Sequence, residues 1–158
     1  MSSAWPKRRD GELYDTDAEI ISRARVNRIS DVFERQGEQQ FRQLETLCIE
    51  DLECDRALQV VVATGGGLPA IPGMMRRLHA LGATVYLKAS VDELWKRLTM
   101  DPRELRDRPL LQTDGRRTLE SLLESRKELY QQATITLDTG SLSVSEVCRL
   151  LVAHIDTD

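Results

Sequence analysis

The chain has 158 residues, a length typical of a single domain that buries about 70% of the surface its unfolded form exposes. Its formal net charge is −4 and 30% of its residues are charged, so the chain lacks the excess of basic residues that is typical of nucleic-acid-binding proteins. No segment approaches the roughly 18 consecutive apolar residues of a membrane helix, so we expect neither nucleic acid nor a membrane as a partner.

The cysteines and the first residues bear on the compartment. Cys48, Cys54 and Cys148 are odd in number and form no CxxC pair, which argues against a disulfide framework and a zinc site and favours a reducing cytoplasm. Residues 1–12 are polar and basic, without periodicity and without the apolar core of a signal peptide. We expect an unassigned tail at 1–12, followed by one domain at 13–158.

Strand and helix patterns alternate along the chain. Four short strands are predicted, at residues 13–15, 60–64, 84–87 and 134–137, and the second is a continuous β-branched run typical of a buried parallel strand. Amphipathic helices are predicted at residues 38–58 and 116–132. The sequence therefore predicts an α/β fold with a parallel sheet flanked by helices on both faces, one compact core, and ligands beyond the carboxyl ends of the strands.

Two further helices are marked by capping boxes. Ser90 precedes Glu93 by three residues, and Ser143 stands in the same relation to Glu146. In this pattern the side chain of each residue bonds to the backbone N–H of the other. Helices are expected to begin at both places.

Two acidic residues, Asp15 and Asp17, follow the first strand with Thr16 between them. In an extended conformation both carboxylates would point to the same side, an arrangement that suits magnesium or the recognition of a hydroxyl group. The alternative is that one of the two caps the following helix, a position that favours Asp.

Three consecutive glycines, Gly65, Gly66 and Gly67, follow the buried strand. Without side chains, the backbone can adopt positive φ and bring its N–H groups close to an anionic or polar ligand. A tight turn would also explain them, but their place at the end of a parallel strand favours a binding loop.

Charged residues also fall on apolar helix faces. Glu45 lies on the inward stripe of its predicted helix, three residues after Arg42, and an ordinary surface ion pair is the simpler interpretation of these two alone. Arg126 repeats the pattern on the apolar stripe of another helix. Two inward arginines suggest a buried anion, because a guanidinium binds a carboxylate in bidentate fashion.

Residues 99–112, TMDPRELRDRPLLQ, have the length and composition of a lid loop. Its arginines Arg103, Arg106 and Arg108 are most simply solvated surface charges. One of them carried over a transferring phosphate would instead stabilise the charge of the transition state.

The segments DTDAEI, GEQQFRQLE, VVATGGG, RPLLQ and SLLESRKELY occur in the order and spacing of shikimate kinase, which the chain resembles over about residues 13–155. That family has a P-loop NTPase fold. It phosphorylates the 3-hydroxyl of shikimate with ATP and Mg²⁺, in the pathway to chorismate and the aromatic amino acids.

The resemblance implies roles on the shikimate side. Asp17 would accept hydrogen bonds from the hydroxyls and act as, or near, the base for the attacking hydroxyl. Arg42 and Arg126 would hold the carboxylate, and Glu45 would orient Arg42. Backbone contacts would come from the glycine loop, Gly65, Gly66 and Gly67.

Other roles fall on the nucleotide side. Asp15 would help to hold Mg²⁺, through water. Arg108 would reach the phosphates of ATP, and Arg97 would lie near the adenine. A second adenine-side arginine is often found after the last strand of the family, where this chain has GSLS.

The beginning of the chain departs from the family pattern. Shikimate kinases start with a strand, a GxxxxGK[ST] loop and a helix, which residues 1–12 do not match. We expect this first strand and helix, about 30 residues, to be missing, with a gap between the strands at 60–64 and 84–87. Without the loop, the chain by itself is expected to have weak or no kinase activity, and to bind ATP only if the P-loop is supplied.

Three hypotheses follow. The chain is a kinase whose true start lies upstream, or a non-catalytic shikimate-binding or interaction protein derived from the kinase. The third is another small-molecule kinase, such as one acting on gluconate, which gives no reason for two inward arginines. A monomer is expected in each case.

Overall fold

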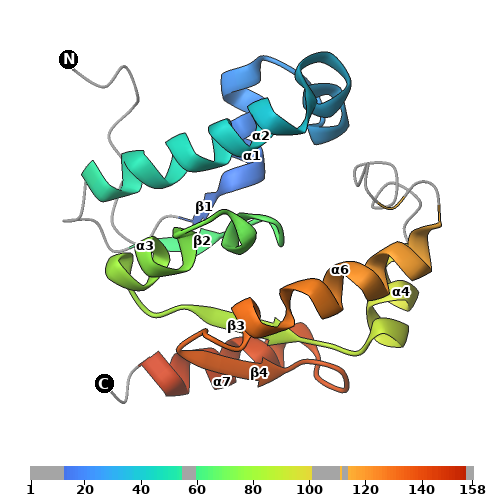
Figure 1. Ribbon diagram of the computed structural model, residues 1–158. Coiled ribbons are helices and arrows are strands. Elements are labelled where there is room, and N and C mark those ends of the chain that lie inside the picture. Colours follow the sequence, from blue (N-terminus) through green and yellow to red (C-terminus); the bar gives the residue numbers. More distant parts are fainter. Residues whose placement is uncertain (1–12, 55–59, 101–110, 112–113, 156–158) are drawn as a thin grey trace. The chain divides into compact units, whose positions relative to one another are not determined.

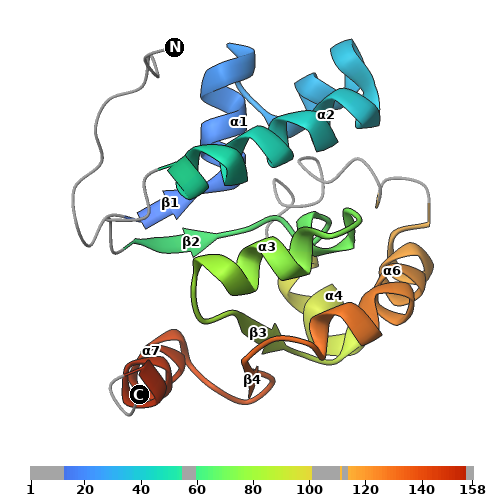
Figure 2. The ribbon, with the colours of Figure 1, turned by 60° about the vertical axis from the view of Figure 1, so that its left-hand side comes forward.

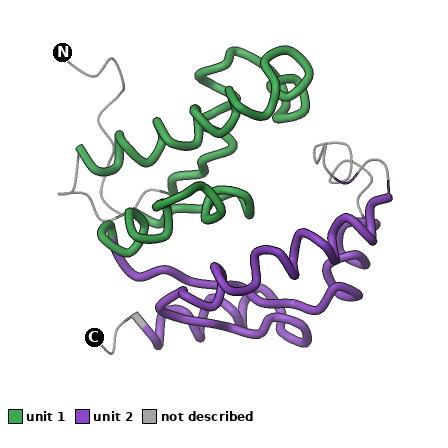
Figure 3. The backbone as a smooth tube through the Cα atoms, in the orientation of Figure 1, with its two compact units in different colours: residues 1–81 green, residues 82–158 purple. Residues whose placement is uncertain are grey.

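The computed structural model describes residues 13–54, 60–100, 111 and 114–155. The chain divides into two compact units, residues 1–81 and 82–158 (Figure 3). The prediction of one compact core is therefore wrong at this level. The second and third strands belong to separate sheets, so no strand pairing among the described residues joins the two units.

Among the described residues of the first unit, the elements are β1 Leu13–Asp15, α1 Thr16–Ala24, α2 Ile29–Cys54, β2 Val61–Ala63, the 3₁₀ helix η1 Leu68–Ala70 and α3 Met74–Leu81. Figure 1 shows how they are arranged. The two strands are parallel, with Leu13 opposite Val61 and Asp15 opposite Ala63. Helices α1 and α2 lie against each other on one side of this strand pair in both ribbon views (Figures 1 and 2).

One apolar core holds the first unit together. It is built from β1, α1, α2, η1 and α3, with the buried side chains Tyr14, Ile20, Val32, Phe41, Leu44, Cys48, Ile49, Leu52, Leu68 and Met74. Burial of each large aliphatic side chain stabilises the fold by roughly 1.5–3 kcal/mol. This core fixes the carboxyl end of β1 against α2.

Helix α2 is longer than the predicted helix and contains a kink. Gly37 has φ 79° and ψ 171°, a conformation that favours glycine, and it separates a short N-terminal segment from the helix predicted to start at residue 38. The side chain of Asp31 accepts hydrogen bonds from the backbone N–H groups of Asn27 and Arg28, which closes the turn after α1. The predicted end of this helix, at 55–58, lies outside the described residues.

The second unit contains β3 Val85–Lys88, α4 Val91–Met100, α6 Gly115–Tyr130, β4 Ile135–Asp138 and α7 Val144–Ile155. Its two strands are parallel, with Val85 opposite Ile135 and Lys88 opposite Asp138. Helix α4 packs against α6, and the ring of Trp95 lies so close to Gly115 that a Cβ there would be 2.7 Å from it.

Both capping boxes mark helix starts. The N–H of Ser143 donates to Glu146 Oε2 at 2.8 Å, and the N–H of Glu146 donates to Ser143 Oγ at 3.4 Å, which confirms the box before α7. Before α4, the N–H of Glu93 donates to Ser90 Oγ at 3.2 Å. The Glu93 carboxylate pairs with Arg97 one turn later, so this box is only half formed among the described residues.

The strands are more exposed than predicted. Val61 in β2 is 66% exposed and Leu87 in β3 is 53% exposed, so the prediction of a buried parallel strand at 60–64 is wrong for Val61. The physical reason is that each strand belongs to a two-stranded sheet with one neighbour. β2 pairs with β1 and β3 pairs with β4, and the expected gap between β2 and β3 stays a prediction. Among the helices of the described residues, none is long and apolar enough to span a membrane.

Candidate functional site

The parallel register of β1 and β2 brings two predicted motifs together. Asp15 lies opposite Ala63, so the residues after these two strands meet beyond their carboxyl ends. The backbone N–H of Gly65 donates to Thr16 Oγ1 at 3.3 Å, and the Thr16 side chain is fully buried. Thr16 therefore ties the glycine loop to the start of α1. This role was not predicted from the sequence, where the only signal was a hydroxyl-bearing residue between two strand-end acids.

The two aspartates have different positions. The DTD segment is not extended, contrary to expectation, because α1 begins at Thr16 directly after the strand. Asp15 Oδ1 accepts hydrogen bonds from the N–H groups of Asp17 at 2.9 Å and Ala18 at 3.2 Å, so the capping alternative is correct for Asp15. Asp17 is half-buried in the first turn of α1.

Two carboxylates converge on Gly65. A Cβ built on this glycine would lie 3.3 Å from Asp17 Oδ1 and 3.4 Å from Glu45 Oε1. Both oxygens are excluded from solvent. The side chains of α1 and α2 thus approach the glycine loop from two elements, and a larger residue at position 65 would force them to shift.

The glycine loop serves close approach rather than unusual backbone angles. Among the described residues, positive φ occurs at Arg25, Gly37 and Gly73 but at no glycine of the 65–67 loop, so the loop does not use this freedom of glycine. Gly67 has φ −86° and ψ −23°. The guanidinium of Arg42 lies against Gly67, and a Cβ at this position would be 2.8 Å from Arg42 Nη2.

Arg42 is held by two glutamates. Its Nη1 donates to Glu45 Oε2 at 2.7 Å, and its Nη2 donates to Glu38 Oε1 at 3.0 Å. The guanidinium carbon also lies 5.4 Å from the centre of the Phe41 ring, which packs on Phe33. Burial lowers the pKa of Arg42, but the hydrogen bonds and charges of the two glutamates outweigh this effect and raise it.

Glu45 is buried, as its place on the apolar stripe predicted. Its side chain is 1% exposed, whereas that of Glu38 is 55% exposed. The prediction of an inward-facing acid paired with Arg42 is therefore confirmed, and the alternative of an ordinary surface pair is wrong. Glu38 was not singled out from the sequence, although its spacing of four residues from Arg42 on one helix was a signal.

In the second unit, Arg126 lies on the half-buried face of α6. The predicted stripe residues Leu122 and Leu123 share this face. Because Arg126 and Arg42 belong to different units, the binding of one carboxylate by both arginines stays a prediction.

Arg97 is engaged within its own unit. Its guanidinium donates to the backbone oxygen of Thr139 at 2.7 Å, to Thr139 Oγ1 at 3.2 Å and to Glu93 Oε1 at 2.7 Å. These bonds fasten the end of β4 to α4. A contact with adenine remains a prediction for this residue.

The predicted lid is only partly described. Thr99 and Met100 belong to the last turn of α4, where Thr99 Oγ1 donates to the backbone oxygen of Trp95, so the loop begins later than the predicted residue 99. Leu111 is buried. Arg108 and the other lid arginines lie outside the described residues, and their roles stay predictions.

The fit of Mg²⁺ depends on Asp15. The described part of the chain contains no group of three or more His, Cys, Asp or Glu side chains that could hold a metal ion. Mg²⁺ commonly keeps several waters and binds one or two carboxylates together with substrate phosphates. The second carboxylate oxygen of Asp15, which does not cap α1, is compatible with that mode.

Comparisons with known proteins identify the family of this chain. The family model described as shikimate kinase matches residues 7–156, slightly more than the 13–155 expected. Shikimate kinase of Burkholderia thailandensis is 36% identical over 158 residues, covering 99% of this chain and 82% of the relative. That of Bordetella pertussis is 37% identical over 146 residues, and the chain spans 66% of its length, just under two thirds.

Solved structures show the same fold. Shikimate kinase from Acinetobacter baumannii, in complex with shikimate, has a TM-score of 0.81 at 29% identity and covers 94% of this chain and 79% of its own. The enzyme from Aquifex aeolicus has a TM-score of 0.71 at 28% identity, over 92% of this chain and 81% of its own. With its α/β, P-loop NTPase fold, the chain belongs to the shikimate kinase family.

Proposed function

We propose that this chain binds shikimate at the carboxyl ends of β1 and β2, and that its reaction is the ATP-dependent phosphorylation of the 3-hydroxyl. The observation that carries the proposal is the convergence of Asp17, Glu45 and Arg42 on the glycine loop. Three separate parts of the first unit contribute to it: the first turn of α1, the helix α2, and the glycine loop. The first turn of α1 and the glycine loop follow the carboxyl ends of the parallel strands β1 and β2.

The chemistry of these groups suits a hydroxylated carboxylic acid. Arg42 offers charge-assisted hydrogen bonds to the carboxylate, and Arg126 is its proposed second holder. Asp17 accepts a hydrogen bond from a ligand hydroxyl and stands as the base, or near it, for the hydroxyl that attacks ATP. The solved Acinetobacter relative in complex with shikimate supports this ligand class.

The nucleotide side is proposed from fewer groups. Mg²⁺ bound with ATP would neutralise charge on the phosphates, and Asp15 would hold the hydrated ion. Arg108 would contact the phosphates. Phosphoryl transfer also depends on a GxxxxGK[ST] loop, a pattern that does not occur in the 158 residues. We therefore propose that these residues alone bind shikimate but transfer phosphate weakly or not at all.

A second candidate function is shikimate binding without catalysis. It is favoured by two observations together. Asp17, Arg42 and Glu45 meet at the glycine loop, whereas the phosphate-loop pattern does not occur in the 158 residues. Fusing a strand, GxxxxGK[ST] loop and helix from a shikimate kinase before residue 13 separates the two candidates. Recovered turnover supports the kinase, whereas a correctly folded fusion that binds both ligands without turnover supports the binding protein.

The direct test is isothermal titration calorimetry of the 158-residue chain with shikimate, and with gluconate as the control ligand. We expect binding of shikimate only, reduced at least tenfold in Arg42→Lys and in Arg126→Lys, because a lysine cannot make the bidentate contact. Circular dichroism checks that each variant is folded. A folded wild-type chain that binds no shikimate, or prefers gluconate, would refute the proposed function.

A further inference from the structure

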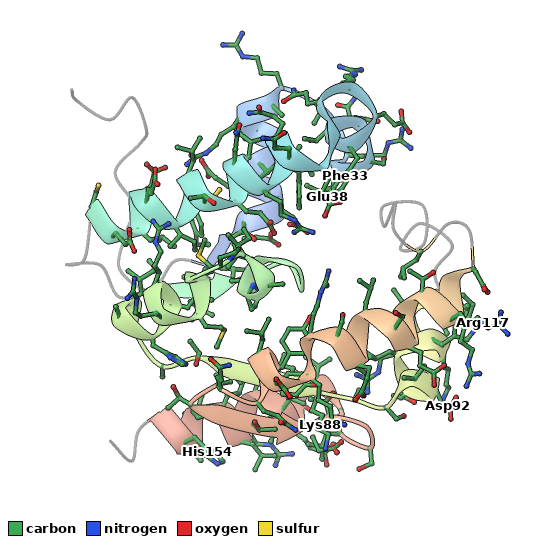
Figure 4. All side chains as sticks on the ribbon, in the orientation of Figure 1. Phe33, Glu38, Lys88, Asp92, Arg117 and His154 are labelled. Atoms are coloured by element: carbon green, nitrogen blue, oxygen red, sulfur yellow. The ribbon has the colours of Figure 1, made fainter. Side chains whose placement is uncertain are left out.

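The two glutamates that hold Arg42 differ sharply in exposure. Glu45 has a side chain that is 1% exposed, and that of Glu38 is 55% exposed. Figure 4 labels Glu38 on helix α2. Both pair with the same guanidinium, Glu45 at 2.7 Å and Glu38 at 3.0 Å. Glu45 is therefore a fixed partner of Arg42, and Glu38 is an exchangeable one.

The strengths of the two contacts support this distinction. An exposed ion pair four residues apart on a helix stabilises only weakly, because water screens its charges. Glu38 also follows the kink at Gly37, the non-helical residue inside α2, and is therefore the first residue of the long segment of this helix. The cost of releasing Glu38 from Arg42 is thus small. Releasing Glu45 would leave a buried carboxylate without its cation, which costs far more.

The charges around Arg42 also favour release of Glu38 when a ligand binds. Arg42 already faces the carboxylates of Glu38 and Glu45. Asp17 places a third carboxylate beside Gly65. A ligand carboxylate at Nη2 of Arg42 would meet the carboxylate of Glu38, and like charges at that distance repel each other, so Glu38 has to move away when the ligand binds.

We propose that Glu38 is an internal substitute for the ligand's carboxylate: it occupies Nη2 of Arg42 in the ligand-free protein and is displaced when the ligand binds. The inference rests on the proposed function, in which Arg42 holds the carboxylate of shikimate. Glu38 then keeps the guanidinium oriented and its charge compensated before binding. It also sets a threshold against weak anions, because each must compete with a carboxylate that is already in place.

Removal of the Glu38 charge tests the proposal. Glu38→Gln keeps the size of the side chain and an amide oxygen that accepts from Arg42, but a neutral acceptor bonds about half as strongly as a charged one. We expect this variant to bind shikimate about twofold more tightly, by calorimetry. The uncharged methyl ester of shikimate should bind the variant and the wild type equally, since it brings no charge to displace Glu38.

Glu34→Gln is the matched control. Glu34 is exposed on the same helix, and the ion pairs of Arg42 are made with Glu38 and Glu45, so this change removes one negative charge without touching the guanidinium. We expect it to leave shikimate affinity equal to that of the wild type within the error of the titration. A similar gain in both variants would show a general charge effect and overturn the proposal.

The remaining outcomes separate this inference from the proposed function. If Glu38→Gln weakens binding of shikimate, or leaves it unchanged, Glu38 is a permanent positioning residue and the exchange is refuted. The proposed function survives that result as long as Arg42→Lys still reduces shikimate affinity. If Arg42→Lys has no effect in a folded protein, the proposed function fails, whatever the behaviour of Glu38.

Discussion

The guanidinium of Arg42 lies directly against Gly67. A side chain at position 67 would have its Cβ 2.8 Å from Nη2 and 2.9 Å from Cζ of Arg42. Gly67 has ordinary φ and ψ angles, so the reason for glycine at this position is space for the arginine.

Gly67→Ala is therefore expected to displace Arg42 and to reduce shikimate affinity at least tenfold, because the guanidinium loses the position in which both glutamates hold it. Titration calorimetry measures the effect. Gly82→Ala is the control, since a Cβ at Gly82 meets nothing within 4 Å and its φ is not positive. Equal affinities of the two variants would contradict the steric role of Gly67.

Glu45→Gln tests the buried ion pair. The change removes the charge that faces Arg42 from inside the core, and we expect the free energy of unfolding to fall by about 2 kcal/mol, less than for a fully buried pair because Arg42 is partly exposed and retains Glu38. Urea denaturation measures this loss. A variant as stable as the wild type would show that the pair contributes nothing net to the fold.

Thr16→Val tests the link between the glycine loop and α1. The valine keeps the buried volume but leaves the Gly65 N–H without the Oγ1 that accepts its hydrogen bond. We expect a loss of about 1 kcal/mol in the free energy of unfolding, together with weaker shikimate binding. Thr16→Ser retains the oxygen and should bind shikimate like the wild type. The role assigned to Thr16 is wrong if serine and valine behave alike.

Asp31 predicts a pH dependence of stability. The hydrogen bond from Arg28 is the largest cause that holds the pKa of this carboxyl below its usual value, and backbone N–H groups of the α1–α2 turn add to it. Because the folded pKa is the lower one, the stabilisation is fully present above the pKa of the unfolded chain, about 3.9, and is lost as the pH falls through the folded value.

We therefore expect Asp31→Asn to lower the thermal unfolding midpoint at pH 7, and the difference from the wild type to shrink as the pH falls below the pKa of the unfolded chain towards the lower folded pKa. Differential scanning calorimetry from pH 3 to pH 7 follows the difference between the two proteins. A difference that stays constant over this range would rule out the ionised carboxylate as the cause.

Local patterns predicted much of the fold and the inward position of Glu45 beside Arg42. Glu45 was placed inward because it repeats the spacing of Phe41 and Cys48, and all three are buried. The capping box at Ser143 identified the start of α7 because it depends on residues only three apart. Such features are decided within one or two turns of a helix, so the sequence alone suffices to find them.

Other features depended on distant residues. Which of Asp15 and Asp17 caps the following helix could not be decided until the end of β1 was located. The exposure of Val61 depends on how many neighbours its strand has, which no local pattern contains. The contact between the Arg42 guanidinium and Gly67 joins residues that are far apart in the chain.

By itself, the sequence determined the alternation of strands and helices, the resemblance to shikimate kinase, and the residue types that serve a hydroxylated acid. These follow from periodicity and from short motifs, which are local. The tertiary structure decided which of these residues meet. The parallel register of β1 and β2 joins Thr16 to Gly65, and the packing of α2 brings Arg42 against Gly67, because contacts between residues far apart in the chain exist only once the core has formed.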